Sequence, residues 1–356
     1  MEDDKLCKAL EGRGEVFYTF SVFCIKRGDY LLLALPEDRK SAQKTLALYH
    51  PQSFKARMLI WVVASLVALN LHRILPQRKL RIRESGPLAK LRNSEGHIGF
   101  LLGNAEADAR RAIVVHPADG KTGGYVVDKI GLGAAAKKSV IDERVVIESL
   151  PKNNAGLPQI CDQGEADGWA FYTTPYLHGH SPRGSDQEAV LELLKIWAQN
   201  AVLKPLHLTR QWTMMREAAS GKEARMLMLS QLEALSDLKI KVGLFHGDFA
   251  PWNLKISSDK SFLDVMDWES GSPEGPAGWD GLHYIIQVAT LVDRLSAAGA
   301  LKRCRDWAGS QEGRDFLEVT GWGQHGEVWI GSYLMYSSWV AGYEREELLE
   351  EWNVPI

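Results

Sequence analysis

The stretch around residue 250 constrains this chain most, because it places three oxygen-bearing side chains beside two short apolar runs. Asp248 follows the run Val242–Phe245, Asn253 comes five residues after Asp248, and Asp267 follows the run Phe262–Met266. Such runs are typical of short strands, which would hold the loop residues in fixed positions. A loop Asp can accept the proton of a hydroxyl group, and an Asn facing an Asp can hold Mg²⁺ through oxygen. The spacing therefore predicts a site for phosphoryl transfer.

The same residues resemble the motif of a known family. His246-Gly247-Asp248 with Asn253, followed by Asp267-Trp268-Glu269, resembles the aminoglycoside phosphotransferase and choline kinase group of small-molecule kinases. Protein kinases carry Arg at the position of Gly247 and Phe-Gly after the metal-binding Asp. The resemblance implies an α+β, two-lobed protein-kinase-like fold. Its small lobe has an antiparallel sheet with one helix, its larger lobe is mainly helical, and in this chain an N-terminal extension precedes both.

The resemblance also implies a reaction, in which the γ-phosphoryl group of ATP or GTP moves to a hydroxyl of a small molecule such as a sugar, an amino alcohol or an aminoglycoside-like compound. Asp248 would orient and deprotonate the acceptor hydroxyl, Asn253 and Asp267 would hold Mg²⁺, and His246 would brace the loop. Asp280, which ends a loop rich in Gly and Pro, would brace the catalytic loop and cap a helix. The alternatives are a non-catalytic kinase-like module that binds a nucleotide or a partner, and a kinase fold with a protein acceptor.

Two charged residues upstream are candidates for binding the nucleotide. The apolar run Tyr125–Ile130 predicts a strand, and Lys129 stands where the family places the lysine that contacts the α- and β-phosphates. A helix is predicted over 138–150, and Glu143 stands where the family places the acid that pairs with this lysine. Glu148 on the same helix is the alternative partner.

Two further segments complete the nucleotide site that the resemblance implies. Gly99, Gly103 and Asn104 lie between two apolar runs and resemble a phosphate-covering turn, although an ordinary hairpin explains the two glycines equally well. Thr174 and Tyr176 lie in the segment that resembles the adenine-binding hinge. The order along the chain predicts an N-terminal extension over 1–93, a small lobe over 94–172, a hinge over 173–178 and a large lobe over 179–356.

Composition limits the kinds of binding partner and the cellular compartment that the chain is expected to have. The chain has 356 residues, 45% of them apolar, and a net charge of -3, which argues against a chain-wide affinity for nucleic acid. Its four cysteines (Cys7, Cys24, Cys161, Cys304) have the spacing of neither a zinc site nor a disulfide framework. The acidic start Met1–Asp4 lacks the positive charge of a secretory signal. A cytoplasmic location, in part peripheral to the membrane, is therefore predicted.

The extension carries a basic and apolar segment. Met58–Leu71 holds no charged residue, but at fourteen residues it is shorter than the roughly 20 that a membrane span needs. From Lys55 to Arg92 there are nine Lys and Arg residues against one acid, Glu84. One interpretation is a buried helix, and the other is peripheral contact of residues 55–92 with an anionic membrane or with a protein partner.

The last hundred residues are rich in tryptophan. Eight of the twelve Trp residues come after Phe245. Aromatic walls bind quaternary ammonium groups through cation–π attraction, which would suit a choline-like substrate. Packing of a helical lobe explains the same residues without a ligand. The sequence does not identify the substrate.

Overall fold

The computed structural model describes residues 2–27, 30–49, 54–91, 97–102, 111–118, 124–152, 154–257, 259 and 262–352. The chain divides into two compact units. The N-terminal unit comprises residues 1–145 and 159–176, and the C-terminal unit comprises residues 146–158 and 177–356.

The N-terminal unit is built on an antiparallel sheet, which in the described part of the chain has eight strands in the order β3-β1-β2-β4-β5-β6-β8-β7. The strands are β1 (Val16–Arg27), β2 (Tyr30–Leu35), β3 (Gln77–Arg83), β4 (Gly99–Leu102), β5 (Arg111–Pro117), β6 (Tyr125–Leu132), β7 (Asp162–Ala166) and β8 (Trp169–Pro175). The helices that begin in this unit are α1 (Glu2–Glu11), α2 (Arg39–Leu46), α3 (Phe54–Ala68) and α4 (Ala134–Ser149).

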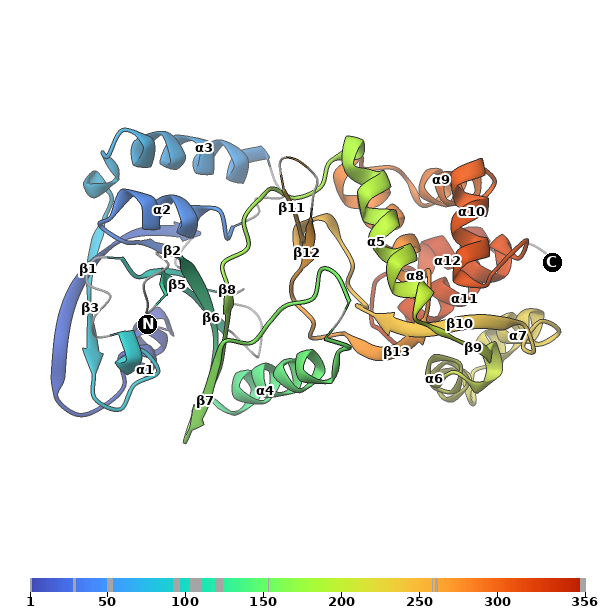
Figure 1. Cartoon of the computed structure of the whole chain (residues 1–356), viewed down its shortest axis with the longest axis horizontal. Helices are drawn as coiled ribbons and strands as arrows, with labels where there is room; N and C mark the ends of the chain where they lie inside the picture. Colours follow the sequence, from blue (N-terminus) through green and yellow to red (C-terminus); the bar gives the residue numbers. More distant parts are fainter. Residues whose placement is uncertain are drawn as a thin grey trace. The chain divides into compact units, whose positions relative to one another are not determined.

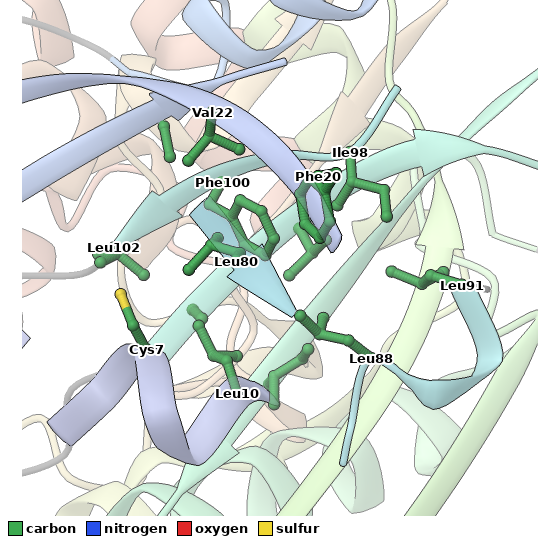
Figure 2. Packing of buried hydrophobic residues seen from close by; sticks show 14 of the residues in the cluster. Cys7, Leu10, Phe20, Val22, Leu80, Leu88, Leu91, Ile98, Phe100 and Leu102 are labelled. Carbon is green, nitrogen blue, oxygen red and sulfur yellow. The ribbon is translucent and has the colours of Figure 1, made fainter. Parts of the chain in front are cut away.

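Alternating apolar residues of β1 build a core on each face of this sheet, because successive side chains of a strand point to opposite faces. Phe20 and Val22 join one core, to which α1 contributes Cys7 and Leu10. Figure 2 shows these side chains converging with those of β3 and β4. Phe23 and Ile25 of β1 join the other core, which α2 and α3 cover (Ala42, Leu46, Val63, Val67). Helices thus cover part of each face of the sheet.

The predicted boundary at residue 93 does not divide the structure. Strand β2 pairs with β4, with Leu33 opposite Leu101, so strands from both sides of that residue form one sheet. This pairing was not predictable from composition and turns, which are local, because strand pairing depends on residues far apart in the chain. Residues 1–93 are thus an integral part of the N-terminal unit, which passes into the C-terminal unit after Tyr176, inside the predicted hinge.

A cluster of charged residues around the buried Asp128 connects Lys90, near the end of the predicted extension, to the sheet. Lys90 Nζ lies 3.0 Å from Asp128 Oδ1, 3.0 Å from Asp162 Oδ2 and 2.9 Å from Thr173 Oγ1. Asp128 is fully buried beside His116 on the strand that also carries Lys129. Burial acts to raise the pKa of Asp128, but the hydrogen bond and charge of His116 and the charge of Lys90 outweigh it, so the pKa lies below its ordinary value.

Replacing Lys90 with Met is expected to lower the free energy of unfolding by about 3 kcal/mol, because removing one partner leaves Asp128 buried with less compensation. Lys138→Met is the matched control, since Lys138 makes an exposed ion pair with Asp142 and its loss should change stability by less than about 1 kcal/mol. Urea unfolding followed by circular dichroism measures both. Equal midpoints for the two variants would show that the cluster adds no stability.

The C-terminal unit is mainly helical. Its helices are α5 (Gln187–Gln199), α6 (Arg210–Ala219), α7 (Glu223–Glu233), α8 (Trp279–Gln287), α9 (Ala297–Ala308), α10 (Gln311–Thr320), α11 (Gly326–Trp339) and α12 (Glu346–Trp352). Its strands are β9 (Val202–Pro205), β10 (Lys239–Phe245), β11 (Leu254–Ile256), β12 (Leu263–Val265) and β13 (Ser272–Pro276). In the described residues they form the sheet β13-β10-β9 and the hairpin β11-β12. The predicted α+β class, one unit with an antiparallel sheet and one mainly helical, is confirmed.

The tryptophans of this unit build its core. Five of the eight that follow Phe245 are fully buried (Trp268, Trp279, Trp322, Trp329, Trp352). Trp279 packs against Phe245 and Tyr333, and Trp268 packs against Trp197 and His246. Core packing therefore accounts for these five rings without a ligand.

Helix α3 is only half buried, in contrast to the buried helix that its composition suggested. Val63 and Val67 are buried, whereas Trp61 is 71% exposed. No helix in the described part of the chain is long and apolar enough to cross a membrane.

Candidate active site

The loop after β10 begins with a backbone conformation that requires glycine. Gly247 has φ +81°, a value that residues with a side chain rarely adopt. A Cβ at this position would also lie 2.5 Å from the carbonyl oxygen of Ser270. The position that carries Arg in protein kinases is therefore restricted to glycine in this chain by its own backbone.

His246 holds this loop as a neutral brace. Its Nε2 lies 2.8 Å from the carbonyl oxygen of Met266, and its Nδ1 lies 3.2 Å from the backbone N of Asp248. Nδ1 must accept from that N–H, so the proton is on Nε2. Burial lowers the pKa of His246, while the carbonyl of Met266 and the charges of Asp248 and Asp267 act to raise it. The effect of burial is larger, so the pKa lies below its ordinary value. His246 thus ties the loop to the segment that precedes Asp267.

Asp280 supports the same loop from α8. Its carboxylate accepts from the backbone N–H groups of His246, at 2.7 Å, and Gly247, at 3.0 Å. Burial raises the pKa of Asp280 to about 7, against the lowering effect of these two hydrogen bonds. The predicted capping role is corrected: Gly278 is the N-cap of α8, and Asp280 lies in the first turn with its carboxylate turned to the loop.

Asp248 is held through both carboxylate oxygens. Oδ1 accepts from His283 Nε2 at 3.1 Å and from the Tyr343 hydroxyl at 3.0 Å, and Oδ2 accepts from Asn253 Nδ2 at 2.9 Å. Burial acts to raise the pKa of Asp248, but the hydrogen bonds from His283 and Tyr343 outweigh it, so the pKa lies below its ordinary value. The side chain remains 28% exposed. It is a fixed carboxylate with one edge accessible to an incoming donor.

Asn253 and Asp267 lie next to each other across the β11-β12 hairpin. Leu254 pairs with Val265, and the N–H of Met266 donates to the carbonyl oxygen of Asn253 at 2.8 Å. The amide nitrogen of Asn253 is engaged with Asp248, at the backbone oxygen and at Oδ2. The amide nitrogen is thus committed to Asp248, and the amide oxygen is the atom that would serve as a metal ligand.

The backbone of Asp267 is in the left-handed region, with φ +64°. Among the described residues other than glycine, only Asn70 and Arg294 share a positive φ. This conformation is unfavourable by about 1–2 kcal/mol for a residue with a Cβ, and Asp and Asn tolerate it best. An amide oxygen and a carboxylate on adjacent strand ends are hard oxygen donors, which fit Mg²⁺. The metal-binding role of Asn253 and Asp267 stays a prediction.

Two residues that the sequence analysis missed complete the surroundings of Asp248. His283 and Tyr343 donate to Oδ1 from α8 and from the segment between α11 and α12. Behind them, His283 Nδ1 lies 2.6 Å from the Tyr333 hydroxyl, and the guanidinium of Arg345 lies over the rings of Tyr333 and Tyr343. Burial lowers the pKa of His283 to about 4, so it donates as a neutral imidazole. His283 lies three residues after Asp280 and therefore on the same helix face, which was the one available sequence signal.

In the N-terminal unit, Lys129 Nζ lies 2.6 Å from Glu143 Oε2. Glu143 is fully buried and the side chain of Lys129 is nearly so, whereas Glu148 on the same helix is exposed. The ion pair implied by the resemblance is thus present, with Glu143 rather than Glu148. A buried acid behind a lysine holds the ammonium group extended in one direction.

The remaining predicted nucleotide residues are placed as follows. Gly99 lies inside β4, opposite Val115, and a Cβ there would overlap Thr45 of α2, so helix packing accounts for this glycine. Gly103 and Asn104 lie outside the described residues. Thr174 pairs with Val127 in the sheet. The hydroxyl of Tyr176 donates to the carbonyl oxygen of Lys44, and burial raises its pKa to about 12.

Comparison with known proteins finds similarity in structure alone. No family model and no curated protein sequence matches the chain. A mutant of aminoglycoside phosphotransferase APH(4)-Ia, in a complex with ADP and hygromycin B, is 13% identical with a TM-score of 0.45 over 71% of this chain and 90% of its own. APH(3'')-Id from Streptomyces rimosus is 13% identical with a TM-score of 0.40 over 66% and 92%. Plasmodium vivax ethanolamine kinase is 10% identical with a TM-score of 0.44 over 89% and 93%.

These solved structures are small-molecule kinases, the class that the sequence motif resembles. Similarity at this level does not transfer a function to this chain. The function is therefore argued from the side chains of the site.

Proposed function

We propose that this protein transfers the γ-phosphoryl group of a nucleoside triphosphate to a hydroxyl group of a small molecule. The observation that carries the proposal is the fixed carboxylate of Asp248, held by His283, Tyr343 and Asn253 and accessible along one edge. Phosphoryl transfer asks little covalent chemistry of the protein and depends on positioning the acceptor and on compensating charge. The site is built for positioning, since each of these contacts fixes the direction of the carboxylate.

Asp248 accepts the hydrogen bond, and finally the proton, of the acceptor hydroxyl. A carboxylate offers about four lone-pair directions, and three are occupied by His283, Tyr343 and Asn253. The remaining direction is available to a hydroxyl of the substrate. Because the pKa of Asp248 is lowered, the group is ionised at neutral pH and acts mainly by orienting the hydroxyl.

Asn253 and Asp267 would hold Mg²⁺, which supplies compensation of the charge on the β- and γ-phosphates when bound. Asn253 has a second function in this arrangement, since its amide nitrogen fixes Asp248 while its amide oxygen would bind the metal. Lys129, kept extended by Glu143, is the lysine proposed to contact the phosphates of ATP or GTP.

The proposal is tested by measuring phosphate transfer from [γ-³²P]ATP and [γ-³²P]GTP to a panel of sugars, amino alcohols and aminoglycosides, with and without Mg²⁺. Transfer to at least one hydroxyl compound that requires Mg²⁺ is the expected result. A protein that binds MgATP but phosphorylates no member of the panel would instead be a nucleotide-binding module. Transfer to added proteins and not to small molecules would show that the acceptor is a protein.

Tyr343→Phe is expected to lower kcat about 10- to 100-fold, because it removes a hydrogen bond to a charged group while keeping the ring. The pKa of Asp248 should rise toward its ordinary value, since the hydroxyl now helps to hold it down. The acidic limb of the pH–rate profile should therefore move to higher pH. Tyr336→Phe, a half-buried tyrosine that packs on Trp279, is the matched control. A lower kcat with an unchanged pH profile would show that Tyr343 contributes through packing and not through its hydrogen bond to Asp248.

A further inference from the structure

The outer face of α3 exposes large apolar side chains that a water-soluble surface does not require. Trp61 is 71% exposed, and Met58, Leu59 and Val62 beside it are also exposed. The opposite face of the helix, with Val63 and Val67, packs on the core that α2 and the sheet share. Figure 1 shows α3 as the outer helix beyond α2 on this side of the sheet. The helix is therefore apolar on both faces, and one of these faces is presented to solvent.

The apolar surface continues past the end of α3 in a defined conformation. Asn70 adopts φ +59°, the N–H of Leu71 bonds to the carbonyl of Leu66, and the N–H of Asn70 bonds to that of Val67. This is the hydrogen-bond pattern of a capped helix end. Leu69 is 69% exposed and Ile74 is 73% exposed, while His72 between them is buried and bonded to Pro36. The exposed apolar residues thus belong to an ordered segment and are not a frayed end.

The chain segment that forms this surface is basic, and Arg73 within it pairs with Glu37 from outside the segment. From Phe54 to Arg83 the sequence holds seven Lys and Arg residues and no Asp or Glu. Lys55 and Arg57 are exposed on the first turn of α3, and Lys79 and Arg81 are exposed on β3. In β3 the alternate residues Leu80 and Ile82 enter the core on the α1 side. Lys79 and Arg81 therefore point to the side of the sheet that α2 and α3 cover.

We propose that this surface, defined by the exposed residues of α3, the turn through Ile74 and the basic residues of β3, binds an anionic lipid membrane. An exposed Trp among Leu, Met and Val, bordered by Lys and Arg, is the composition of helices that lie in the membrane interface. The occupant must carry negative charge to match the exposed basic residues of α3 and β3. A second copy of the chain fits poorly, because a two-fold contact through this surface would set the basic residues of both copies against each other.

Binding to vesicles of phosphatidylcholine with 30% phosphatidylserine tests the proposal, using the full chain in a sedimentation assay. Binding is expected at 0.01 M salt, a marked loss of it at 1 M salt, and little binding to pure phosphatidylcholine, because the Debye length falls from about 30 Å to 3 Å between these salt concentrations. Lys55→Glu with Lys79→Glu should weaken binding at least about 20-fold, since each basic residue near the surface contributes about fivefold.

A matched pair of substitutions separates this surface from general hydrophobicity. Trp61→Glu should abolish binding, whereas Leu227→Glu, which alters a residue 67% exposed on α7 of the other unit, should leave it unchanged. Both substitutions lie at exposed positions, so circular dichroism and the melting temperature should stay at wild-type values. Equal effects of the two, or no binding of the wild type at any salt concentration, would overturn the proposal. So would a dimer in sedimentation velocity that Trp61→Glu dissociates, or a protein partner that binds here in place of lipid.

Discussion

Asp248→Asn is expected to lower the rate of phosphoryl transfer by about 10²–10⁴-fold, the range that a positioned general base contributes. The Asn side chain has the size of Asp but neither its negative charge nor its ability to take the proton of the acceptor hydroxyl. The surroundings can accommodate it. If the amide oxygen faces Asn253, the new NH₂ group faces His283, whose neutral ring can accept after a change of tautomer, and the Tyr343 hydroxyl can donate to the Gly247 carbonyl, 3.2 Å away.

The nucleotide should still bind to this variant, because Lys129, Asn253 and Asp267 are proposed to hold it and its metal. The hypothesis thus requires a divided result, in which turnover is lost while MgATP affinity and the melting temperature are kept. Asp264→Asn makes the same chemical change in the adjacent β12 and serves as the control for folding and metal binding. If Asp248→Asn lost nucleotide affinity in parallel with turnover, Asp248 would be structural. Unchanged transfer would remove it from the mechanism.

The part of the site that the sequence predicted is the part whose contacts are local. His246, Asp248, Asn253 and Asp267 lie on one strand–loop–hairpin unit, so their spacing along the chain largely fixes their spacing in space. The supporting role of Asp280 was implied by the family resemblance, and its carboxylate does bond to the loop. Its place in the helix was predicted less well, because Gly278 can begin α8 in a left-handed conformation that places Asp280 in the first turn and not at the cap.

The contacts that hold Asp248 from behind were not visible in the sequence. Tyr343 lies 95 residues after Asp248 and reaches it only because α8 and α11 pack together. The chain has ten tyrosines, and the residues next to Tyr343 in the sequence do not distinguish it from the others. His283 had a weak signal in its distance from Asp280, but a His on an apolar helix is ordinarily a core residue. Such partners depend on tertiary packing and require coordinates.

The N-terminal region shows the same limit at the level of the fold. The turns and the apolar runs of β1 and β2 were evident from composition, but the pairing of Leu33 with Leu101 joins residues 68 positions apart. Helix α3 shows the opposite problem, since its uninterrupted apolar sequence is compatible with burial on all sides. Trp61 is exposed because α2 and the sheet pack against only the opposite face of α3. The sequence of α3 alone does not indicate this.

Asp267→Asn is expected to weaken Mg²⁺-dependent binding of ATP by on the order of 100-fold or more. Loss of a residue that only supports a metal ligand already lowers affinity 10- to 100-fold, and Asp267 is proposed as a direct ligand with a negative charge. Asn is the informative replacement because it also tolerates the left-handed backbone at φ +64°. Asp267→Ala would add backbone strain to the loss of the ligand, and the two effects would be confounded.

Titration of the nucleotide with and without Mg²⁺, by calorimetry, measures the effect directly. Wild type should bind more tightly with the metal, and Asp267→Asn should lose that difference while Asp264→Asn keeps it. Asp267→Gly provides an independent check through stability: glycine relieves the strain of the positive φ, so the melting temperature should not fall although metal-dependent binding is lost. If Asp267 only stabilised the fold, Asp267→Gly would lower the melting temperature and leave metal-dependent binding unchanged. Metal-dependent binding as tight as in wild type in both variants would place the Mg²⁺ ligands elsewhere in the chain.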